Sequence, residues 1–372
     1  MRKTVVFAII FLFISVEAIP GMYGKIEDLI IPIYGKTIYV DDDFNDDPYN
    51  HTWNTIEEGL ADAENGDLIR VYNGTYKENL EVNKSVTIQG NNSQDTIIDG
   101  NYIRRVINIT TYDVKIIGFK IINCGNIGDD NKGIEIWWGK NIIISDNFFS
   151  NNNIDLVISY SDGIAGEIII SNNTFSKGRD YNDGLDAYKS NNLIIQNNTF
   201  IEKHRGVYQY DADAIILSNN IFENCNTSIF LLESLENRIM YNEISVSNQT
   251  GFLGIWLENS NNNKVLYNFI NSTINFKILT GILVKRSNSN TIQYNDFNLN
   301  LLAMSCINSF FNKICWNNFI SSTSGWDLQC TICLNLYWFN YWNQLKGPFG
   351  RVLGGCIIFC IPWSPWPWQK IF

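Results

Sequence analysis

The sequence predicts an all-β protein, a single-stranded right-handed parallel β-helix with a short N-terminal capping helix. Three observations predict it. A motif of the form I-x-x-N-x-F returns along the chain, with an aliphatic residue allowed at either end. Its copies are 22 to 27 residues apart, a spacing typical of solenoids rather than of domains with one central core. The repeats are rich in Ile, Val, Phe and Asn, which favour strands and turns.

The asparagine of the motif sets the register of the repeats. Its copies are Asn147, Asn173, Asn198, Asn220, Asn242, Asn268, Asn295, Asn317 and Asn340. A small residue stands 14 residues earlier in seven copies, at Gly133, Gly184, Gly206, Ser228, Gly254, Gly281 and Ala303. Length variation is therefore expected between the motif and the next small residue. We expect the asparagine to adopt left-handed geometry at a tight turn and its amide to hydrogen-bond to asparagines in neighbouring rungs, the turns of the coil.

The first residues predict export. Residues 1–18 combine the basic Arg2 and Lys3, an apolar run and a small-x-small sequence ending at Ala18, as in a secretory signal peptide. No later apolar run is long enough to span a membrane, so we expect a secreted or cell-surface protein. The net charge of −11 becomes −12 when Arg2, Lys3 and Glu17 are removed. This acidic balance argues against nucleic acid and anionic lipid as partners.

The coil is predicted over residues 36–346. Residues 36–40 form a first strand, followed by an acidic run that is either a solvated loop or a Ca²⁺ site. The run contains Asp41, Asp42, Asp43, Asp46 and Asp47. Residues 53–63 predict a helix, with Ile56 and Leu60 at helical spacing. Such a helix would cover the open end of the coil, where strand edges are unpaired.

Several segments resemble a known family. The repeats, the start TIYVDDDF, GDLIRVYNGTYKENLEV and NKSVTIQG followed by TIIDG resemble NosD-like secreted β-helix proteins of the pectin-lyase-like fold. The resemblance covers nearly the whole mature chain and implies the fold, but such folds host lyases, glycosidases, epimerases and non-catalytic surface proteins. The resemblance suggests a role in copper binding. The chain has few imidazole and thioether ligands for copper, because it contains two His and four Met.

Within each rung, the first and third positions after the small residue are apolar and should fill the coil. The second and fourth positions should face outward as aromatic residues flanked by carboxylates. We expect these to bind carbohydrate or another extended polymer along the side of the coil. The predicted binding residues are Glu135, Trp137, Tyr188, Tyr208, Tyr210, Phe230, Trp256 and Glu258. The alternative is that nearby loops cover this face.

The densest cluster of ionisable residues surrounds Gly184 and Gly206. The candidate catalytic residues are Asp183, Asp186, Lys189, Arg205 and Asp211. One interpretation is cross-strand ion pairing, of Asp183 with Arg205 and of Lys189 with Asp211. Another is a lyase site, with Ca²⁺ held by acids and a proton removed by Lys189 or Arg205. A third is a glycosidase pair of Asp186 and Glu135, two rungs apart.

Cysteine usage and the C-terminal segment complete the prediction. Cys306, Cys315, Cys330, Cys333, Cys356 and Cys360 are expected to form disulfides or buried thiols, with a metal site at the last four as the alternative. Cys124 and Cys225 should be buried thiols. Residues 347–372, rich in Pro and Trp, should stop the repeat and serve as a cap or a docking tail.

Together these observations predict a secreted or cell-surface protein that binds a polysaccharide or cell-surface glycan along its lateral face, without catalysis. The alternatives are a polysaccharide lyase or glycoside hydrolase, and a purely structural surface repeat.

Overall fold

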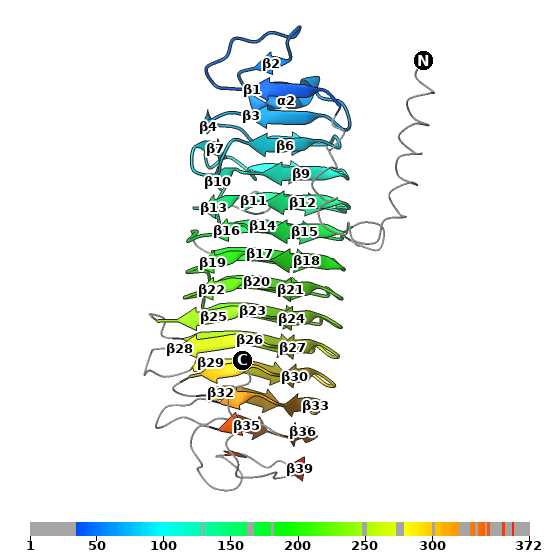
Figure 1. Cartoon of the computed structure of the whole chain (residues 1–372), viewed down its shortest axis with the longest axis vertical. Coiled ribbons are helices and arrows are strands. Elements are labelled where there is room, and N and C mark those ends of the chain that lie inside the picture. Colours follow the sequence, from blue (N-terminus) through cyan, green and yellow to red (C-terminus); the bar gives the residue numbers. More distant parts are fainter. Residues whose placement is uncertain are drawn as a thin grey trace, which may run out of the picture. The chain divides into compact units, whose positions relative to one another are not determined.

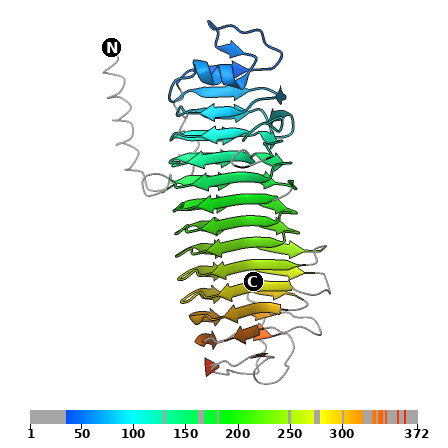
Figure 2. The same cartoon turned by 180° about the vertical axis from the view of Figure 1, so that it is seen from behind.

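The computed structural model describes residues 35–319, apart from residues 127, 129–130, 162–166, 180–181, 248–250, 273–278 and 300–301. Beyond residue 319 it describes the backbone of 328–331, 334–338, 341–342, 352–353 and 359–360. Within the unit from Lys36 onward, the chain coils through three parallel sheets, so the predicted fold class is confirmed (Figures 1 and 2). The predicted signal peptide lies outside the described residues.

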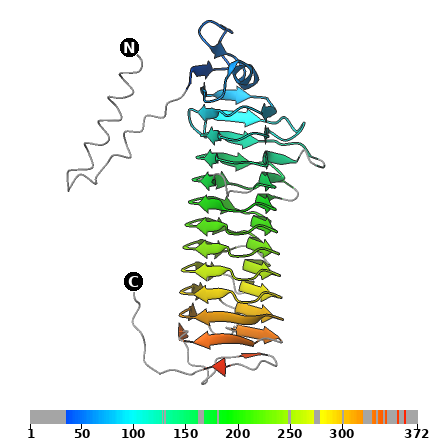
Figure 3. The ribbon, with the colours of Figure 1, turned by 90° about the vertical axis from the view of Figure 1, so that its right-hand side faces the viewer.

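Each sheet takes one strand from each rung, in the repeating order C, A, B (Figure 3). Sheet A contains β1 (Thr37–Val40), β2 (Thr52–Trp53), β3 (Leu68–Val71), β6 (Thr87–Gly90), β9 (Val114–Ile117), β12 (Ile142–Ser145), β15 (Ile168–Ser171), β18 (Leu193–Gln196), β21 (Ile216–Ser218), β24 (Arg238–Met240), β27 (Lys264–Leu266), β30 (Thr291–Gln293), β33 (Phe310–Cys315), β36 (Leu334–Trp338) and β39 (Phe359–Cys360). Sheet B contains β4 (Gly74–Tyr76), β7 (Thr96–Asp99), β10 (Lys120–Ile122), β13 (Phe148–Ser150), β16 (Thr174–Phe175), β19 (Thr199–Ile201), β22 (Ile221–Glu223), β25 (Glu243–Val246), β28 (Phe269–Ser272), β31 (Asp296–Asn298), β34 (Asn318–Phe319) and β37 (Tyr341–Trp342). Sheet C contains β5 (Leu80–Val82), β8 (Ile107–Ile109), β11 (Lys132–Trp137), β14 (Ile154–Ser159), β17 (Asp183–Tyr188), β20 (Arg205–Tyr210), β23 (Thr227–Leu232), β26 (Phe252–Glu258), β29 (Leu279–Lys285), β32 (Leu302–Ile307), β35 (Leu328–Thr331) and β38 (Val352–Leu353).

The interior is a stack of apolar side chains that repeat from rung to rung. Phe149, Phe175, Phe200 and Phe222 pack face to face, with ring centroids 4.6 to 4.9 Å apart and planes within 7°. The predicted inward positions are confirmed, since Ile134, Ile136, Ile255, Leu257, Ile282 and Val284 are all fully buried. Stacking identical residues at the rung spacing gives each ring a neighbour on both faces, which removes apolar area from water.

Helix α2 (Ile56–Asp62) lies at the N-terminal end of the coil (Figure 1). Thr55 caps it, its hydroxyl accepting from the Glu58 N–H and donating to the Glu58 carboxylate. Ile56 and Leu60 are buried against the first rungs. At the other end of the helix, the Lys84 ammonium donates hydrogen bonds to three backbone carbonyl groups, at 2.7 to 2.8 Å. The predicted helix is thus confirmed, but it begins three residues later than expected.

The asparagine ladder is confirmed from Asn147 to Asn317. In each ladder asparagine before the last, the backbone N–H and the side-chain amide both donate to the Oδ1 of the next one, as in Asn220 with Asn242 at 3.0 Å. Asn340 lies outside the described residues. The expectation that the ladder asparagine itself is left-handed is wrong. The residue just before it carries the positive φ, from 54° to 60°, at Asp146, Asn172, Asn197, Asn219, Tyr241, Tyr267, Tyr294 and Trp316.

Two further ladders, not predicted from the sequence, hold the turn between sheets C and A. One is formed by Asn237, Asn263, Asn290 and Asn312. The other is formed by serines, in which each hydroxyl accepts the backbone N–H of the rung before, including Ser161, Ser190, Ser234, Ser260, Ser287 and Ser309. These buried side chains satisfy backbone groups that the sheets leave unpaired at the corners.

One rung departs from the predicted spacing. Its connection between β14 and β15 is lengthened, and Asp155 occupies the place where other rungs carry a small residue. The Asp155 carboxylate is fully buried and contacts the ammonium of Lys203, itself buried, at 2.5 Å. Burial raises the pKa of Asp155 to about 6, although Lys203 acts in the opposite direction. Insertions therefore have a second location besides the connections from sheet B to sheet C.

The burial of the cysteine thiols and the end of the coil were also predicted from the sequence, and the structure tests both in part. Cys124 and Cys225 are buried free thiols, as expected, and Cys306 and Cys315 are also buried, one of the two outcomes expected for them. Burial raises the pKa of the Cys225 thiol to about 12, so it is inert. The side chains of the last four cysteines lie outside the described residues. Strands β38 and β39 pair with β35 and β36, so pairing continues beyond residue 346, the predicted end of the coil.

Candidate functional site

The outer face of sheet C carries the predicted site residues in two columns. The registers of the paired strands place Glu135, Val157, Asp186, Tyr208, Phe230 and Trp256 in the first column. The second column holds Trp137, Ser159, Tyr188, Tyr210, Leu232 and Glu258. Their inward neighbours along each strand fill the core, so these side chains point away from the coil. Glu135 and Asp186 are two rungs apart, with Val157 between them.

The two glutamates of this face are held in ion pairs. Glu135 is 1% exposed and contacts Arg105 and Lys132, the latter at 2.9 Å. Glu258 contacts Arg286 and, at 3.0 Å, Lys285. Those cations hold the pKa of Glu258 below its usual range, although partial burial acts in the opposite direction. The role of both glutamates in ligand binding stays a prediction, but their oxygens already have protein partners.

Asp183, Asp186 and Arg205 form a cluster on β17 and β20. The guanidinium of Arg205 contacts the Asp183 carboxylate at 2.6 Å and the Asp186 carboxylate at 3.5 Å. Asp183 also accepts from the Arg205 backbone N–H at 3.0 Å and contacts His204 at 3.2 Å. The predicted cross-strand pairing of Asp183 with Arg205 is confirmed. With its side chain 2% exposed, Asp183 has no free oxygen facing solvent.

Asp186 is the perturbed member of the cluster. Burial, followed by the neighbouring charge of Asp183, raises the pKa of Asp186 to about 7, against the opposing effect of Arg205. Its side chain is 15% exposed, and its Oδ1 has no hydrogen-bond partner in the described protein. A carboxyl with such a pKa, beside an ionised one, is typical of functional sites, although structural networks show it too.

A group of aromatic residues, here the aromatic strip, crosses the turn at the end of sheet C. It comprises Trp137, Trp138, Tyr160, Tyr188 and Tyr210. Trp137 stacks on Tyr160 and Tyr188 stacks on Tyr210, with planes at 16° and 15°. The two stacks meet nearly at right angles, because Tyr160 and Tyr188 are inclined at 72°. Lys189 places its ammonium 5.8 and 5.5 Å from the ring centroids of Tyr160 and Tyr188.

The two most exposed rings of this strip were not predicted from the sequence. Trp138 is 63% exposed and Tyr160 is 41% exposed. Both have a positive φ, 50° and 52°, just past the last strand residue. They occupy the fifth position of the rung, where the chain turns and strict alternation ends. Counting aromatic residues one position beyond the strand would have found them.

A second aromatic stack continues along the first column. Tyr208, Phe230 and Trp256 lie one rung apart, with centroid distances of 5.2 and 4.2 Å. Arg205 lies over the Tyr208 ring at 3.9 Å and Lys285 over Trp256 at 5.9 Å. All three rings are partly exposed, so loops do not fully cover this face along the described residues. Asp211, another predicted catalytic residue, is exposed one rung beyond Lys189. The predicted ion pair between these two described residues does not form, because the Lys189 ammonium lies over the rings of Tyr160 and Tyr188.

Among the side chains that the structure describes, those that could hold a metal do not fit copper. The chain has two histidines, and both contact carboxylates, His51 that of Asp62 and His204 that of Asp183. Among the described side chains, the one group of three close metal-ligating atoms is Asp41, Asp42 and Asp43. Carboxylate oxygens suit Ca²⁺ rather than copper, which prefers imidazole and sulfur. The Ca²⁺ site at these aspartates stays a prediction.

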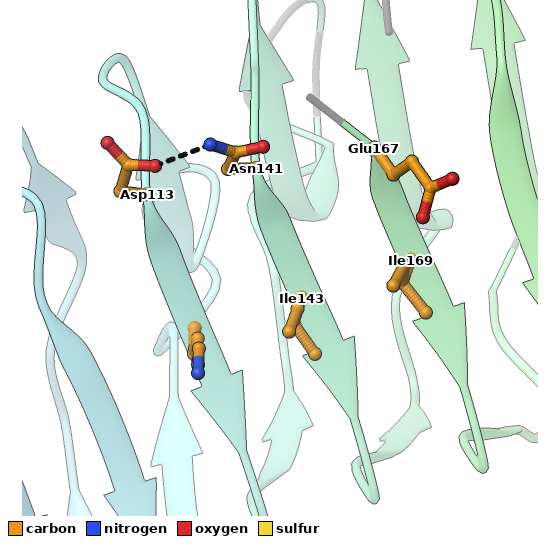
Figure 4. A pocket seen from close by; sticks show the side chains of 6 residues that line it. Asp113, Asn141, Ile143, Glu167 and Ile169 are labelled. Carbon is orange, nitrogen blue, oxygen red and sulfur yellow. Dashed lines mark hydrogen bonds between the residues drawn. The ribbon is translucent and has the colours of Figure 1, made fainter. Parts of the chain in front are cut away.

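A shallow hollow on the outer face of sheet A offers less chemistry (Figure 4). Lys115, Ile143 and Ile169 line it in one row across the paired strands, together with Asp113, Asn141 and Glu167. Asp113 and Asn141 are hydrogen-bonded at 2.8 Å. Its polar residues are exposed or half-exposed and it lacks the aromatic rings of sheet C, so we do not place the site there.

Comparison with known proteins identifies the family and the fold. No helix among the described residues is long and apolar enough to cross a membrane. No curated protein sequence matches the chain.

Three solved structures illustrate the fold. The first is the GH136 lacto-N-biosidase from Eubacterium ramulus, with a TM-score of 0.57 and 12% identity over 83% of this chain and 68% of that one. The second is PfbA, a surface adhesin of Streptococcus pneumoniae, with a TM-score of 0.55 and 14% identity over 77% and 86%. The third is the DFA-IIIase from Arthrobacter chlorophenolicus A6 in complex with DFA-III, with a TM-score of 0.57 and 12% identity over 81% and 93%.

The family assignment comes from the sequence itself. The family model described as "Periplasmic copper-binding protein (NosD)" matches residues 33–280, which is more than half of the chain. This match includes the capping helix, the acidic cluster around Arg205 and the aromatic strip. The chain therefore belongs to the NosD family of parallel β-helix proteins.

Proposed function

We propose that this protein binds a glycan along the outer face of sheet C, outside the cytoplasmic membrane, without cleaving it. The observation that carries the proposal is the aromatic strip, whose rings do not all stack in parallel. Tyr188 meets Tyr160 at 72° instead of stacking on it, and Trp138 and Tyr160 are 63% and 41% exposed, so ring surface of the strip is open to a ligand. Sugar rings bind aromatic faces through their C–H groups, while flanking polar groups take their hydroxyls.

A second exposed set of aromatic residues provides a contrast. Tyr241, Tyr267, Tyr294 and Trp316, here the tyrosine ladder, stack at the turn between sheets A and B. The planes of adjacent rings lie within 14° of each other, so each inner ring has a neighbour stacked on both faces. This ladder is exposed at its edges and suits stabilisation of the turn rather than sugar binding.

The structural neighbours support a carbohydrate ligand by analogy. They are a lacto-N-biosidase, a surface adhesin and a DFA-IIIase in complex with DFA-III, so the fold carries both catalytic and adhesive functions. The family description as periplasmic and the signal-like residues 1–18 support a location outside the cytoplasmic membrane.

Two variants matched in exposure and backbone geometry test the proposal. Tyr160 is 41% exposed at φ 52° and Tyr267 is 39% exposed at φ 56°. Asparagine tolerates this φ, so Tyr160→Asn and Tyr267→Asn should both fold. Tyr160→Asn should weaken glycan binding by more than about 1 kcal/mol, measured by calorimetry on a glycan selected from an array. Equal affinities of the two variants would remove the aromatic strip from the binding site.

Acid–base catalysis at Asp186 is the second candidate, favoured by its raised pKa. Glycoside hydrolysis generally needs two carboxyl groups that reach the substrate. Asp183 has its oxygens held by Arg205 and His204, and Glu135 is buried against Arg105 and Lys132. Asp186 would thus act without a second free carboxylate from this cluster, which favours binding over turnover. Product analysis of the bound glycan, with Asp186→Asn as control, distinguishes the two.

A further inference from the structure

We propose, on the basis of the proposed function, that the glycan bound by the outer face of sheet C is an uncharged polysaccharide rather than a uronate or sulfated one. Three features of this face favour an uncharged ligand: its paired charges, the field at the aromatic strip and the polar atoms that lack protein partners.

The cations that flank the two columns are already compensated. Arg105 and Lys132 contact Glu135, and Lys285 and Arg286 contact Glu258. Arg205 contacts Asp183 and Asp186. A carboxylate or sulfate group on a ligand would have to displace one of these protein carboxylates to reach a guanidinium or ammonium. It would gain little, since it replaces one ion pair with another and leaves a protein carboxylate unpaired.

The field at the aromatic strip is also unfavourable to anions. The nearby Glu233 raises the pKa of Tyr210, chiefly through its negative charge. Asp211 is exposed beside the same turn. Lys189 is the cation of the strip, and its ammonium lies over the rings of Tyr160 and Tyr188. One lysine facing two carboxylates, on a chain with a net charge of −11, does not make an anion-binding surface.

Buried polar atoms without protein partners lie just beneath this face. Among the described residues, they include the oxygens Asn108 Oδ1 and Asp186 Oδ1 and the nitrogens Arg205 Nε and Trp256 Nε1. Asn108, Asp186 and Trp256 belong to one column, and Arg205 lies beside it. The set contains both acceptors and donors. A hydroxyl group both donates and accepts, so a neutral sugar matches this set once a covering side chain turns, whereas an anionic group only accepts.

The test compares purified neutral polysaccharides (β-glucan, xylan, mannan) with polygalacturonate and chondroitin sulfate. Affinity is measured at about 0.02 M and about 0.5 M NaCl, which spans strong and weak screening. We expect a neutral polysaccharide to bind, with a Kd that changes less than about twofold between the two salt concentrations. Preferential binding of a charged polysaccharide, weakened about tenfold or more by salt, overturns the charge assignment while leaving glycan binding intact. Absence of binding to every polysaccharide overturns the proposed function as well.

A gain-of-function variant gives an independent readout. Asp183→Asn combined with Asp186→Asn removes both carboxylates that contact Arg205. The variant should acquire polygalacturonate binding that disappears at high salt, while Asp211→Asn, at an exposed position, should not. Thermal melting confirms that both variants are folded. If the unaltered protein binds polygalacturonate as tightly as the double variant, Arg205 is not masked and the proposal is wrong.

Discussion

The ladder asparagines and the residues just before them have different structural roles, although the two positions are adjacent and both are often asparagine. Asn220 is fully buried, and its amide nitrogen donates to the carbonyl of Ile195 at 2.9 Å and to Asn242 Oδ1 at 3.0 Å. Asn219 is exposed and has a φ of 54°. The first satisfies hydrogen bonds between rungs, and the second supplies the left-handed turn.

The same substitution at these two positions separates the roles. Asn220→Asp replaces an amide donor with a carboxylate that faces two acceptor oxygens, so it should destabilise the protein by about 1–3 kcal/mol. Asn219→Asp keeps a residue that tolerates positive φ and should cost less than about 0.5 kcal/mol. Chemical denaturation at neutral pH measures both. Equal losses would show that the turn, not the ladder, limits stability.

The raised pKa of Asp186 predicts that the stability of the protein depends on pH. Its pKa is about 7 in the folded protein against 3.8 for the ordinary group, so the folded state binds the proton more tightly. The unfolded chain therefore loses its proton first as pH rises, and stability is lost between about pH 4 and pH 7. Asp186→Asn should raise the melting temperature at pH 8 and leave it nearly unchanged at pH 4. A variant that is destabilised more at pH 8 than at pH 4 would contradict this sign.

The inward isoleucines and the ladder asparagines could be predicted because each repeats at a fixed distance along the chain. The buried pair of Asp155 and Lys203 could not. Asp155 stands in the rung with the lengthened connection, so it falls outside the counted register. Its partner is 48 residues away in sequence, and the two meet only after two rungs have stacked. Pairing across rungs of unequal length is not visible from local spacing.

At the scale of elements, helix α2 is fixed at both ends by side chains from later rungs. The Glu78 carboxylate accepts from the first N–H groups at Ile56 and Glu57, at 3.0 and 2.8 Å. Lys84 donates to the carbonyl groups at the other end. Negative charge at the N-terminus and positive charge at the C-terminus both stabilise the helix dipole.

The packing of helix α2 on the first rungs predicts that the helix both stabilises the coil and protects its strand edges. Leu60→Ala removes a buried side chain from the helix and should destabilise the protein by about 2–5 kcal/mol. It should also promote concentration-dependent association, because the first strand edges become accessible. Leu235→Ala, at a position 37% exposed, is the matched control and should change neither property much. Denaturation and light scattering measure the two effects. Unchanged scattering of a destabilised Leu60→Ala would assign the helix a packing role without protection of the edge.

Much of the candidate site could be predicted at this scale, because strict alternation along β11, β17 and β20 places Trp137, Asp186 and Tyr208 outward. Alternation ends at the turn, so Trp138 and Tyr160 were missed. The ion pairs of Glu135 depend on Arg105, which lies in an irregular connection before the regular repeats begin. Such contacts depend on loop conformation, which periodicity does not determine.

At the scale of the whole molecule, stability in a solenoid comes mainly from contacts between adjacent rungs. Each rung of the described coil pairs only with the one before and the one after it, in all three sheets. A complete rung should therefore be removable if the residues on either side restore the same register. A fraction of a rung should not be, because it leaves the three sheets out of phase.

Residues 220–241 provide this test, since Asn220 and Asn242 are 22 residues apart in the ladder. Their deletion joins Asn219 to Asn242, brings Phe200 over Ile244 and Tyr208 over Trp256, and restores the ladder bond from Asn198 to Asn242. We expect a folded protein that melts cooperatively, with a modest loss of stability from one fewer rung. Deletion of residues 220–230 removes half as many residues but breaks the register, so it should give an unfolded or aggregated product. Circular dichroism and thermal melting compare the two, and failure of the longer deletion to fold would mean that stability depends on contacts beyond the nearest rungs.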